Sequence, residues 1–301
     1  MDQSLLVFIT VAEKMNFTRA AEALHMTQPA VSQHIQALES EMGTKLLERS
    51  NKYVRLNEAG RIVYRHGKEI AGLYTSMQSL VNDLMNEASG TLAIGASYTF
   101  GEYALPHTIA YLQRHYPEIK PTITIGNTKE IAELVAGRQL DIGIVEGELH
   151  HGNGRLHVEP FAKDRMYIMA SSAHPSLGEA EDVTAAQLQD QTWIVREEGS
   201  GTREATERMF SDIGLQFPAT MEFGSTQIIK ESVEAGLGIT LLSHWAVRKE
   251  LKLGTLNRLT LEGQPVEREF SLVRIDDQLQ TKALQIFLEI LRAHQGLPDL
   301  E

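Results

Sequence analysis

Apolar residues recur with helical spacing at the start of the chain. Leu5, Phe8, Ile9 and Ala12 stand at positions i, i+3, i+4 and i+7, and residues 17 to 24 repeat this spacing. Each segment therefore carries one apolar stripe, and the two stripes can share a core. The pattern predicts two short helices joined by a turn.

A third helix is expected immediately after the second. Thr27 can cap it, because a threonine hydroxyl accepts a hydrogen bond from a free N–H of the first turn, and Pro29 is tolerated only in that turn. The helix should therefore start near Gln28. Its apolar positions fall on one side, at Val31, Ile35, Leu38 and Met42. Short uncharged residues occupy the opposite side, at Pro29, Ser32, Gln33 and Gln36.

Amides and hydroxyls can donate and accept hydrogen bonds at base edges in the major groove of DNA, which admits one helix. The alternative is that this polar face is simply exposed to solvent on an ordinary three-helix core. The segment KLLERSNKYVRLNEAG, a little further along the chain, favours DNA because it has the pattern of a basic two-stranded wing. A tight helix-turn-helix with a wing behind it is a DNA-binding arrangement.

Charge agrees with this interpretation. The chain has a formal net charge of -12, yet residues 1 to 90 hold 9 basic and 10 acidic residues and so account for only -1. Between Lys45 and Lys68, seven basic residues face only Glu48 and Glu58, a local charge of +5. A polyanion can dock there in an otherwise acidic protein.

A long helix is predicted from Glu58 to Ala88, which contains no proline. A heptad seam, with spacings of 4, 4, 3, 4, 3 and 4 residues, is formed by six apolar residues and one histidine: Ile62, His66, Ile70, Leu73, Met77, Leu80 and Leu84. Such a seam suits pairing between the helices of two chains. A dimer of this kind would set the two DNA-contacting helices, one from each chain, about one DNA turn apart. A single helix that packs on its own domain is the alternative, and His66 is a packed histidine or a pH-sensitive element.

The acidic remainder begins with alternating strands and helices. Residues 89 to 97, TITIGN and LDIGIVEG have strand patterns, and two helical segments separate them, the second from Thr128 to Ala136. This order predicts a parallel doubly wound sheet, whose ligands bind beyond the carboxyl ends of the strands. The residues at those ends are Ser97, Tyr98, Thr99, Asn127, Thr128 and Glu146.

A second lobe is expected from about residue 163 to 266, and the chain then returns to the first lobe (about 89–162 and 267–301) with REFSLVRI. The segment GSGTR precedes a helical pattern, so free N–H groups would face the cleft between the lobes and make an anion site. Its members would be Ser200, Gly201, Thr202 and Arg203. A plain glycine turn into a helix is the alternative. The lysine of a phosphate loop is missing, so nucleotide hydrolysis is not suggested.

The segments FTRAAEALHMTQPAVSQHIQALE and EMGTKLLERSNKYVRLNEAG resemble the DNA-binding module of LysR-type transcriptional regulators, and EAGLGITLLSHWAV resembles a recurring feature of their effector domain. ASYTFGEYALP resembles the corresponding segment of the sulfur-assimilation regulators of this family, and the chain is similar to its sulfur-assimilation and carbon-fixation members. The resemblance covers essentially the whole chain. It implies an α plus α/β architecture: a winged helix-turn-helix domain at 1–58 (helix-turn-helix about 18–37), a linker helix at 59–88, and an effector domain at 89–301 like periplasmic solute-binding proteins.

By this resemblance the DNA-binding residues are Arg19, Thr27, Gln28, Pro29, Ser32, Gln33, Gln36, Arg49, Lys52 and Arg55. The family often has a basic residue where Gln33 stands. The resemblance also implies a homodimer or homotetramer that binds double-stranded promoter DNA, contacts RNA polymerase and responds to a small anionic metabolite. No cofactor and no metal are expected.

Two rival functions are disfavoured by the sequence. An enzyme would need a catalytic signature, but the chain has no Cys, no Gly-x-Ser-x-Gly and no His-Glu-x-x-His. The pair His150 and His151 in a Gly-rich loop is more typical of a surface than of a metal site. A solute-binding transport component conflicts with the absence of a signal peptide pattern, and the longest apolar run (236–247) is too short to span a bilayer. We therefore expect a cytoplasmic regulator.

Overall fold

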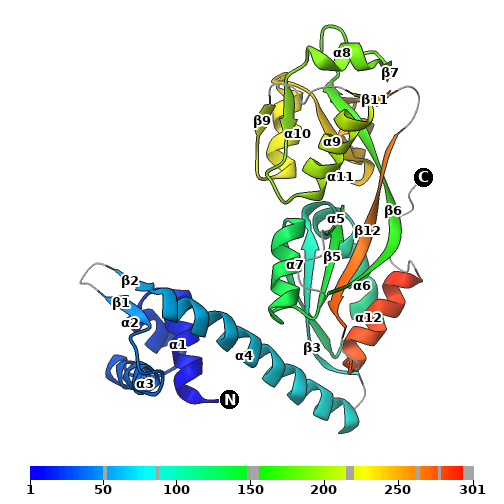
Figure 1. The fold of residues 1–301 in the computed structure, drawn as a ribbon. Coiled ribbons are helices and arrows are strands. Elements are labelled where there is room, and N and C mark those ends of the chain that lie inside the picture. The colour runs from blue at the N-terminus through cyan, green and yellow to red at the C-terminus, as the bar shows by residue number, and fades with distance from the viewer. Residues whose placement is uncertain are drawn as a thin grey trace. The chain divides into compact units, whose positions relative to one another are not determined.

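The computed structural model describes residues 1–49, 53–85, 88–147, 149, 156–214, 220–261, 265–276 and 279–293. The chain forms two compact units (Figure 1): Met1–Met85 with Gly137–Gln139, and Asn86–Ala136 with Leu140–Glu301. The elements of the first unit are α1 (Gln3–Lys14), α2 (Phe17–Ala23), α3 (Gln28–Glu41), β1 (Leu47–Arg49), β2 (Val54–Leu56) and α4 (Glu58–Met85). The predicted winged helix-turn-helix and long helix are confirmed.

Side-chain caps fix where the first three helices begin. Asp2 accepts from the N–H of Leu5, Asn16 accepts from that of Arg19, and Thr27 accepts from that of Ala30 as predicted. Each bond satisfies a backbone donor that has no partner inside its helix. The chain therefore turns twice within a few residues and brings α2 and α3 together.

The predicted stripes form the core of this unit. Phe8, Val31 and Ile35 are fully buried between α1, α2 and α3. The prediction was wrong for Met42, which is 45% exposed. Met42 is the C-cap of α3, one residue beyond its last residue Glu41, at the end of the helix.

The second unit holds the remaining elements. Those before residue 147 are β3 (Gly90–Ser97), α5 (Tyr98–Tyr103), α6 (Leu105–His115), β4 (Ile119–Gly126), α7 (Thr128–Ala136) and β5 (Ile142–Glu146). Those after it are β6 (Leu156–Ser171), β7 (Asp182–Val183), α8 (Ala185–Gln189), β8 (Trp193–Val195), α9 (Gly201–Asp212), β9 (Thr220–Glu222), α10 (Thr226–Glu234), β10 (Thr240–Ser243), α11 (His244–Leu253), β11 (Leu256–Leu261), β12 (Val266–Ile275) and α12 (Lys282–Arg292).

The main sheet has the strand order β4-β3-β5-β12-β6-β11-β7, with β10 also paired to β6. Strand β3 is parallel to both β4 and β5, which confirms the predicted parallel order for the first three strands. Strand β12 then pairs antiparallel with β5 and with β6. The sheet is mixed because the returning chain enters it from the opposite direction.

Strands β6 and β12 are the two crossings between the lobes. They pair antiparallel from Val266 opposite Met166 to Ile275 opposite Leu156, and Figure 1 shows them side by side in green and orange. The register shifts between Phe270 and Ser271. Side chains near the middle of these strands therefore lie where both lobes can reach them.

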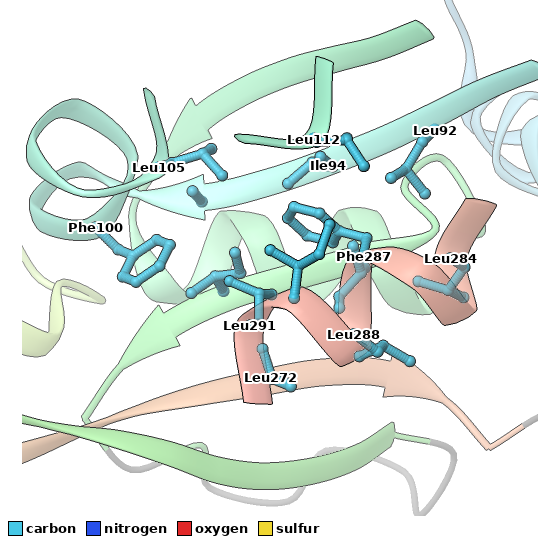
Figure 2. Close-up of a cluster of buried hydrophobic side chains, with 14 of the residues drawn as sticks. Leu92, Ile94, Phe100, Leu105, Leu112, Leu272, Leu284, Phe287, Leu288 and Leu291 are labelled. Carbon is cyan, nitrogen blue, oxygen red and sulfur yellow. The ribbon is translucent and has the colours of Figure 1, made fainter. Parts of the chain in front are cut away.

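Helix α12 completes the core of the first lobe. Figure 2 shows Phe287 and Leu291 of α12 on the side of the helix that faces Ile94 of β3 and Phe100 of α5, and Leu288 belongs to the same buried cluster. Trp245 of the second lobe belongs to the same buried cluster. The lobes thus share apolar contacts as well as the two crossing strands.

Replacing Phe287 by alanine should therefore destabilise the second unit. Phe287 is fully buried, and removing a buried aromatic ring costs about 3–5 kcal/mol through lost transfer energy and the cavity left behind. Urea unfolding followed by tryptophan fluorescence measures it, since Trp245 lies in the same cluster. Leu279→Ala, at a position 70% exposed, is the control and should change little. Equal midpoints for the two variants would contradict the packing described.

Candidate DNA-reading surface and effector site

The outer face of α3 is open to solvent. Gln28, Pro29, Gln33 and Gln36 are exposed, and Ser32 is half-buried. The side-chain amide of Gln28 donates to Ser32 Oγ at 3.1 Å, one helical turn away. The two residues therefore form one small polar group, while Gln33 and Gln36 are exposed to solvent.

Basic side chains lie on the wing and near α2. Arg55 is exposed, and its Nε donates to Glu48 Oε2 at 2.5 Å across the β1–β2 pair. The guanidinium of Arg49 stacks over the Phe17 ring at 4.7 Å. Arg19 is exposed in the first turn of α2. Lys52 lies outside the described residues.

Glu39 holds the end of α3 to the wing from inside. Its Oε1 accepts from the N–H of Leu46 at 3.0 Å and of Leu47 at 3.4 Å, and its Oε2 lies 2.9 Å from Lys45 Nζ and 3.5 Å from Arg49 Nη2. Burial alone would raise the pKa of Glu39, but the Lys45 ammonium, the Leu46 N–H and Arg49 outweigh it and lower that pKa. The buried carboxylate thus positions both cations and the strand that begins at Leu47.

Helix α4 presents the predicted seam to solvent. Ile62, Ile70, Leu73 and Met77 are exposed and Leu80 is half-buried, while Leu84 is 84% exposed. His66 Nδ1 lies 3.5 Å from Glu69 Oε2. A row of large exposed apolar side chains on a helix is typical of an interaction surface.

Three of the residues predicted at the strand ends lie together with Glu146 in the second unit. Ser97 Oγ donates to Glu146 Oε2, and Thr99 Oγ1 donates to Glu146 Oε1 at 3.1 Å. Thr128 Oγ1 donates to the Glu146 carbonyl at 2.8 Å. All four are buried. The carboxyl ends of β3 and β5 therefore bring their polar side chains into one group, as parallel strands require.

Arg268, on β12, lies at the centre of this group. Its Nε donates to Asp164 Oδ2 at 2.7 Å, its Nη1 to Thr202 Oγ1 at 3.0 Å and its Nη2 to Thr99 Oγ1 at 3.0 Å. Nη1 also lies 3.5 Å from Glu146 Oε1. One guanidinium from a crossing strand thus contacts a hydroxyl of the first lobe and a hydroxyl of the second.

Asp164, on the other crossing strand, is the buried counter-ion of Arg268. Ser243 Oγ donates to its Oδ1 at 2.6 Å. Burial raises the pKa of Asp164, and the attraction of Arg268 and the Ser243 hydrogen bond only partly oppose that rise. A buried pair of this kind is costly to desolvate, so its stability depends on its complete set of hydrogen bonds.

The first turn of α9 packs directly against this group. Ser200 is the N-cap and its Oγ accepts from the N–H of Thr202 at 3.3 Å. A Cβ at Gly201 would lie 2.1 Å from the Glu146 carbonyl oxygen, so only glycine lets α9 approach β5 this closely. The close approach is what places the Thr202 hydroxyl on Arg268.

Arg203 of the same turn faces other partners. Its Nε donates to Glu207 Oε1 at 2.5 Å, and its Nη1 donates to the Arg196 carbonyl at 3.2 Å and lies 3.5 Å from Glu222 Oε2. The guanidinium that contacts hydroxyls of both lobes is that of Arg268.

Tyr98 and Asn127 join a second ion pair. The Arg196 guanidinium lies 4.4 Å from the centre of the Tyr98 ring and makes two hydrogen bonds of 2.7 Å to Glu197. Asn127 Nδ2 donates to Glu197 Oε1 at 3.4 Å. Burial would raise the pKa of Glu197, but its bonds to Arg196 lower it. The predicted site residues therefore fall into two adjoining groups, each with its own arginine.

Sequence reasoning missed Arg268, Asp164 and Arg196. A signal existed for the first two, because strand alternation puts Asp164 on the face of Met166 and Ile168, and Arg268 on the face of Phe270 and Leu272. A charged residue on the buried face of an apolar strand is expensive unless it is paired, and it marks a polar site. No such pattern points to Arg196.

Within the described ranges, no group of three or more His, Asp or Glu residues could hold a metal ion. His150 and His151 lie outside those ranges. Among the described residues, no helix is long and apolar enough to cross a membrane.

Residues 3–61 match the model of the bacterial regulatory helix-turn-helix protein, lysR family, and residues 85–296 match the LysR substrate binding domain. The chain is 38% identical over 290 residues, 96% of each chain, to the HTH-type transcriptional regulator CysL of Bacillus subtilis. The chain therefore belongs to the LysR family. It is a LysR-type transcriptional regulator with a C-terminal effector-binding domain.

Solved structures agree on the fold. A full-length OxyR variant from Pseudomonas aeruginosa superposes with a TM-score of 0.74 at 24% identity, covering 99% of this chain and 96% of that one. The regulatory domain of CcmR from Synechocystis, in complex with 2-phosphoglycolate, gives a TM-score of 0.62 at 25% identity, covering 68% of this chain and 97% of that one.

Substituting Glu39 by glutamine should loosen the junction between α3 and the wing. The variant loses hydrogen bonds to charged partners, which contribute about 1–3 kcal/mol together. Because the folded pKa of Glu39 is lowered, its contribution is present above the ordinary value of 4.5 and is lost as the pH falls through the folded pKa.

Amide hydrogen exchange of Leu46 and Leu47 is the measurement. Exchange should be faster in Glu39→Gln than in the unsubstituted protein at neutral pH, and the difference should shrink in acid. Glu58→Gln, which removes an exposed carboxylate near the wing, is the control. Unchanged protection in Glu39→Gln at neutral pH would show that the carboxylate does not hold the junction.

Proposed function

We propose that this regulator senses a small anionic metabolite through the group formed by Ser97, Thr99, Thr202 and Arg268. The proposal rests on Arg268, which lies on a crossing strand. Its guanidinium contacts Thr99 of the first lobe and Thr202 of the second at 3.0 Å each. Hydroxyls and a guanidinium are the groups that bind carboxylate or phosphoryl oxygens. CcmR, a similar domain, was solved with 2-phosphoglycolate, an anion of this class.

The effector can act on DNA only if it prefers one arrangement of the protein over another. Coupling of about 1–3 kcal/mol is typical for such control. The bound anion would replace contacts of Thr99 or Thr202 and so change how the two lobes are held. We further propose that the regulator is cytoplasmic, has no enzymatic activity and needs no cofactor. It would assemble as a homodimer or homotetramer, partly through the α4 seam. The response would be a change in DNA bending or in contact with RNA polymerase.

Thr99→Val keeps the shape of the side chain but removes the hydroxyl, so affinity for the effector should fall about tenfold or more, since a hydrogen bond to a charged group contributes about 1.5–3 kcal/mol. Isothermal titration against a panel of phosphorylated and carboxylated metabolites, 2-phosphoglycolate included, measures it.

Thr108→Val is the matched control. Thr108 is fully buried on α6, and its hydroxyl has no hydrogen-bond partner among the described residues. This variant should fold and bind every panel member like the unsubstituted protein. The proposal fails if no anion of the panel binds, or if Thr99→Val binds its ligand as tightly as Thr108→Val does.

We propose that the amides of Gln33 and Gln36 face base edges while Arg19, Arg49 and Arg55 face phosphates. Gln33→Ala should relax preference at one operator position by about 1–3 kcal/mol, whereas Arg55→Ala should weaken binding to all sequences and lower the salt slope by about 1.

Mobility shifts on promoter DNA at several salt concentrations test this division. Lys163→Ala removes an exposed cation of the effector domain and is the control for total charge. A salt slope that falls equally in Arg55→Ala and Lys163→Ala would contradict the phosphate role of the wing. Unchanged base preference in Gln33→Ala would contradict the reading role.

A further inference from the structure

Glu146 occupies the donors that an anionic effector needs. Its two carboxylate oxygens accept from Ser97 and from Thr99, and one of them also lies 3.5 Å from the Arg268 guanidinium. The side chain is 2% exposed. A carboxylate held by two hydroxyls and a guanidinium is bound as a free carboxylate ligand would be. The chain thus supplies its own anion at this position.

The backbone of Glu146 is fixed independently of its side chain. Its carbonyl accepts from Thr128 Oγ1 at 2.8 Å and packs against Gly201. Its strand is paired with β12 opposite Phe270. Since the main chain is held on three sides, the carboxylate can leave its donors only by rotation about its own side-chain bonds. The Glu146 carboxylate can therefore leave its hydrogen-bond donors while the main chain around it stays in place.

Charge makes a second anion unfavourable while Glu146 stays. Two carboxylates, Glu146 and Asp164, face the single guanidinium of Arg268, so the three sum to -1 when both carboxyls are ionised. A further oxyanion would add like charge in a buried setting, where such repulsion is strong. Without Glu146, the pair of Arg268 and Asp164 is neutral and two hydroxyls regain free donors.

We propose that Glu146 is a specificity-determining residue of the effector site: its carboxylate is an intramolecular competitor that excludes inorganic oxyanions such as sulfate and phosphate. Only an organic anion with further contacts can displace it. This inference rests on the anion-sensing function proposed above and adds the rule by which the site selects its ligand.

Isothermal titration of the full chain with sodium sulfate and with sodium phosphate tests the inference. Glu146→Ala should bind at least one of the two at least about tenfold more tightly than the unsubstituted protein, because the freed donors and the vacated volume accept an oxyanion. Glu146→Gln keeps the size of the side chain and guards against a folding defect. It should show the same direction with a smaller gain, since the amide still fills part of the space.

Two controls tie the gain to this position. Glu159→Ala also removes a carboxylate that makes two bonds to an arginine, Arg292, at 2.8 and 2.7 Å. Its affinity for both ions should stay that of the unsubstituted protein, which shows that freeing any arginine is not enough. Adding Thr99→Val to Glu146→Ala should abolish the gain.

The outcomes separate this inference from the function on which it rests. If neither Glu146 variant binds sulfate or phosphate more tightly, the competitor role is overturned, and binding of a panel metabolite by the unsubstituted protein leaves the proposed function standing. If the Glu159→Ala control gains as much as Glu146→Ala, the role is likewise overturned. If no anion binds to any variant, both proposals fall.

Discussion

The effector-binding unit depends on one buried guanidinium. Arg268 is almost wholly removed from water, and a charge in that position is tolerated only when its partners replace the lost hydration. Asp164, Thr99 and Thr202 do so from three separate segments. Removing one partner of such a pair leaves an uncompensated charge, which costs about 3–5 kcal/mol. The network therefore favours one arrangement of the two lobes over looser ones.

The same network would make the proposed site responsive to a ligand. A rigid apolar contact between the lobes, such as that of Trp245 with the first-lobe core, has no group that a polar ligand can replace. Hydroxyls are different, because Thr99 both donates to Glu146 and accepts from Arg268 and can exchange either partner. A ligand that forms one of these hydrogen bonds replaces an internal bond of the same kind. Its selectivity would therefore depend on the small difference in free energy between the bond formed and the bond lost.

A feature could be predicted from the sequence when the residues that determine it lie close together along the chain. The caps Asn16 and Thr27 act on residues three positions away, so α2 and α3 could be placed from local patterns alone. The pairing of Asp164 with Arg268 spans 104 positions and depends on the register of β6 against β12, which no local pattern contains. Arg203 is next to Thr202, yet its direction is set by Glu207 and Glu222 after folding.

The exposed seam of α4 bears on how DNA would be read, because it offers a surface for pairing two chains. Leu73 and Met77 are about half exposed, and burying such side chains contributes about 25 cal/mol for each Å² of apolar surface removed from water. The polar face of α3 is short and uncharged, so a single copy can recognise few bases. Pairing two chains through the seam would bury apolar surface and double the number of bases read. In such an assembly a preference that the proposed effector creates in one unit would reach both DNA-binding domains, provided that the effector has different affinities for the arrangements that exist.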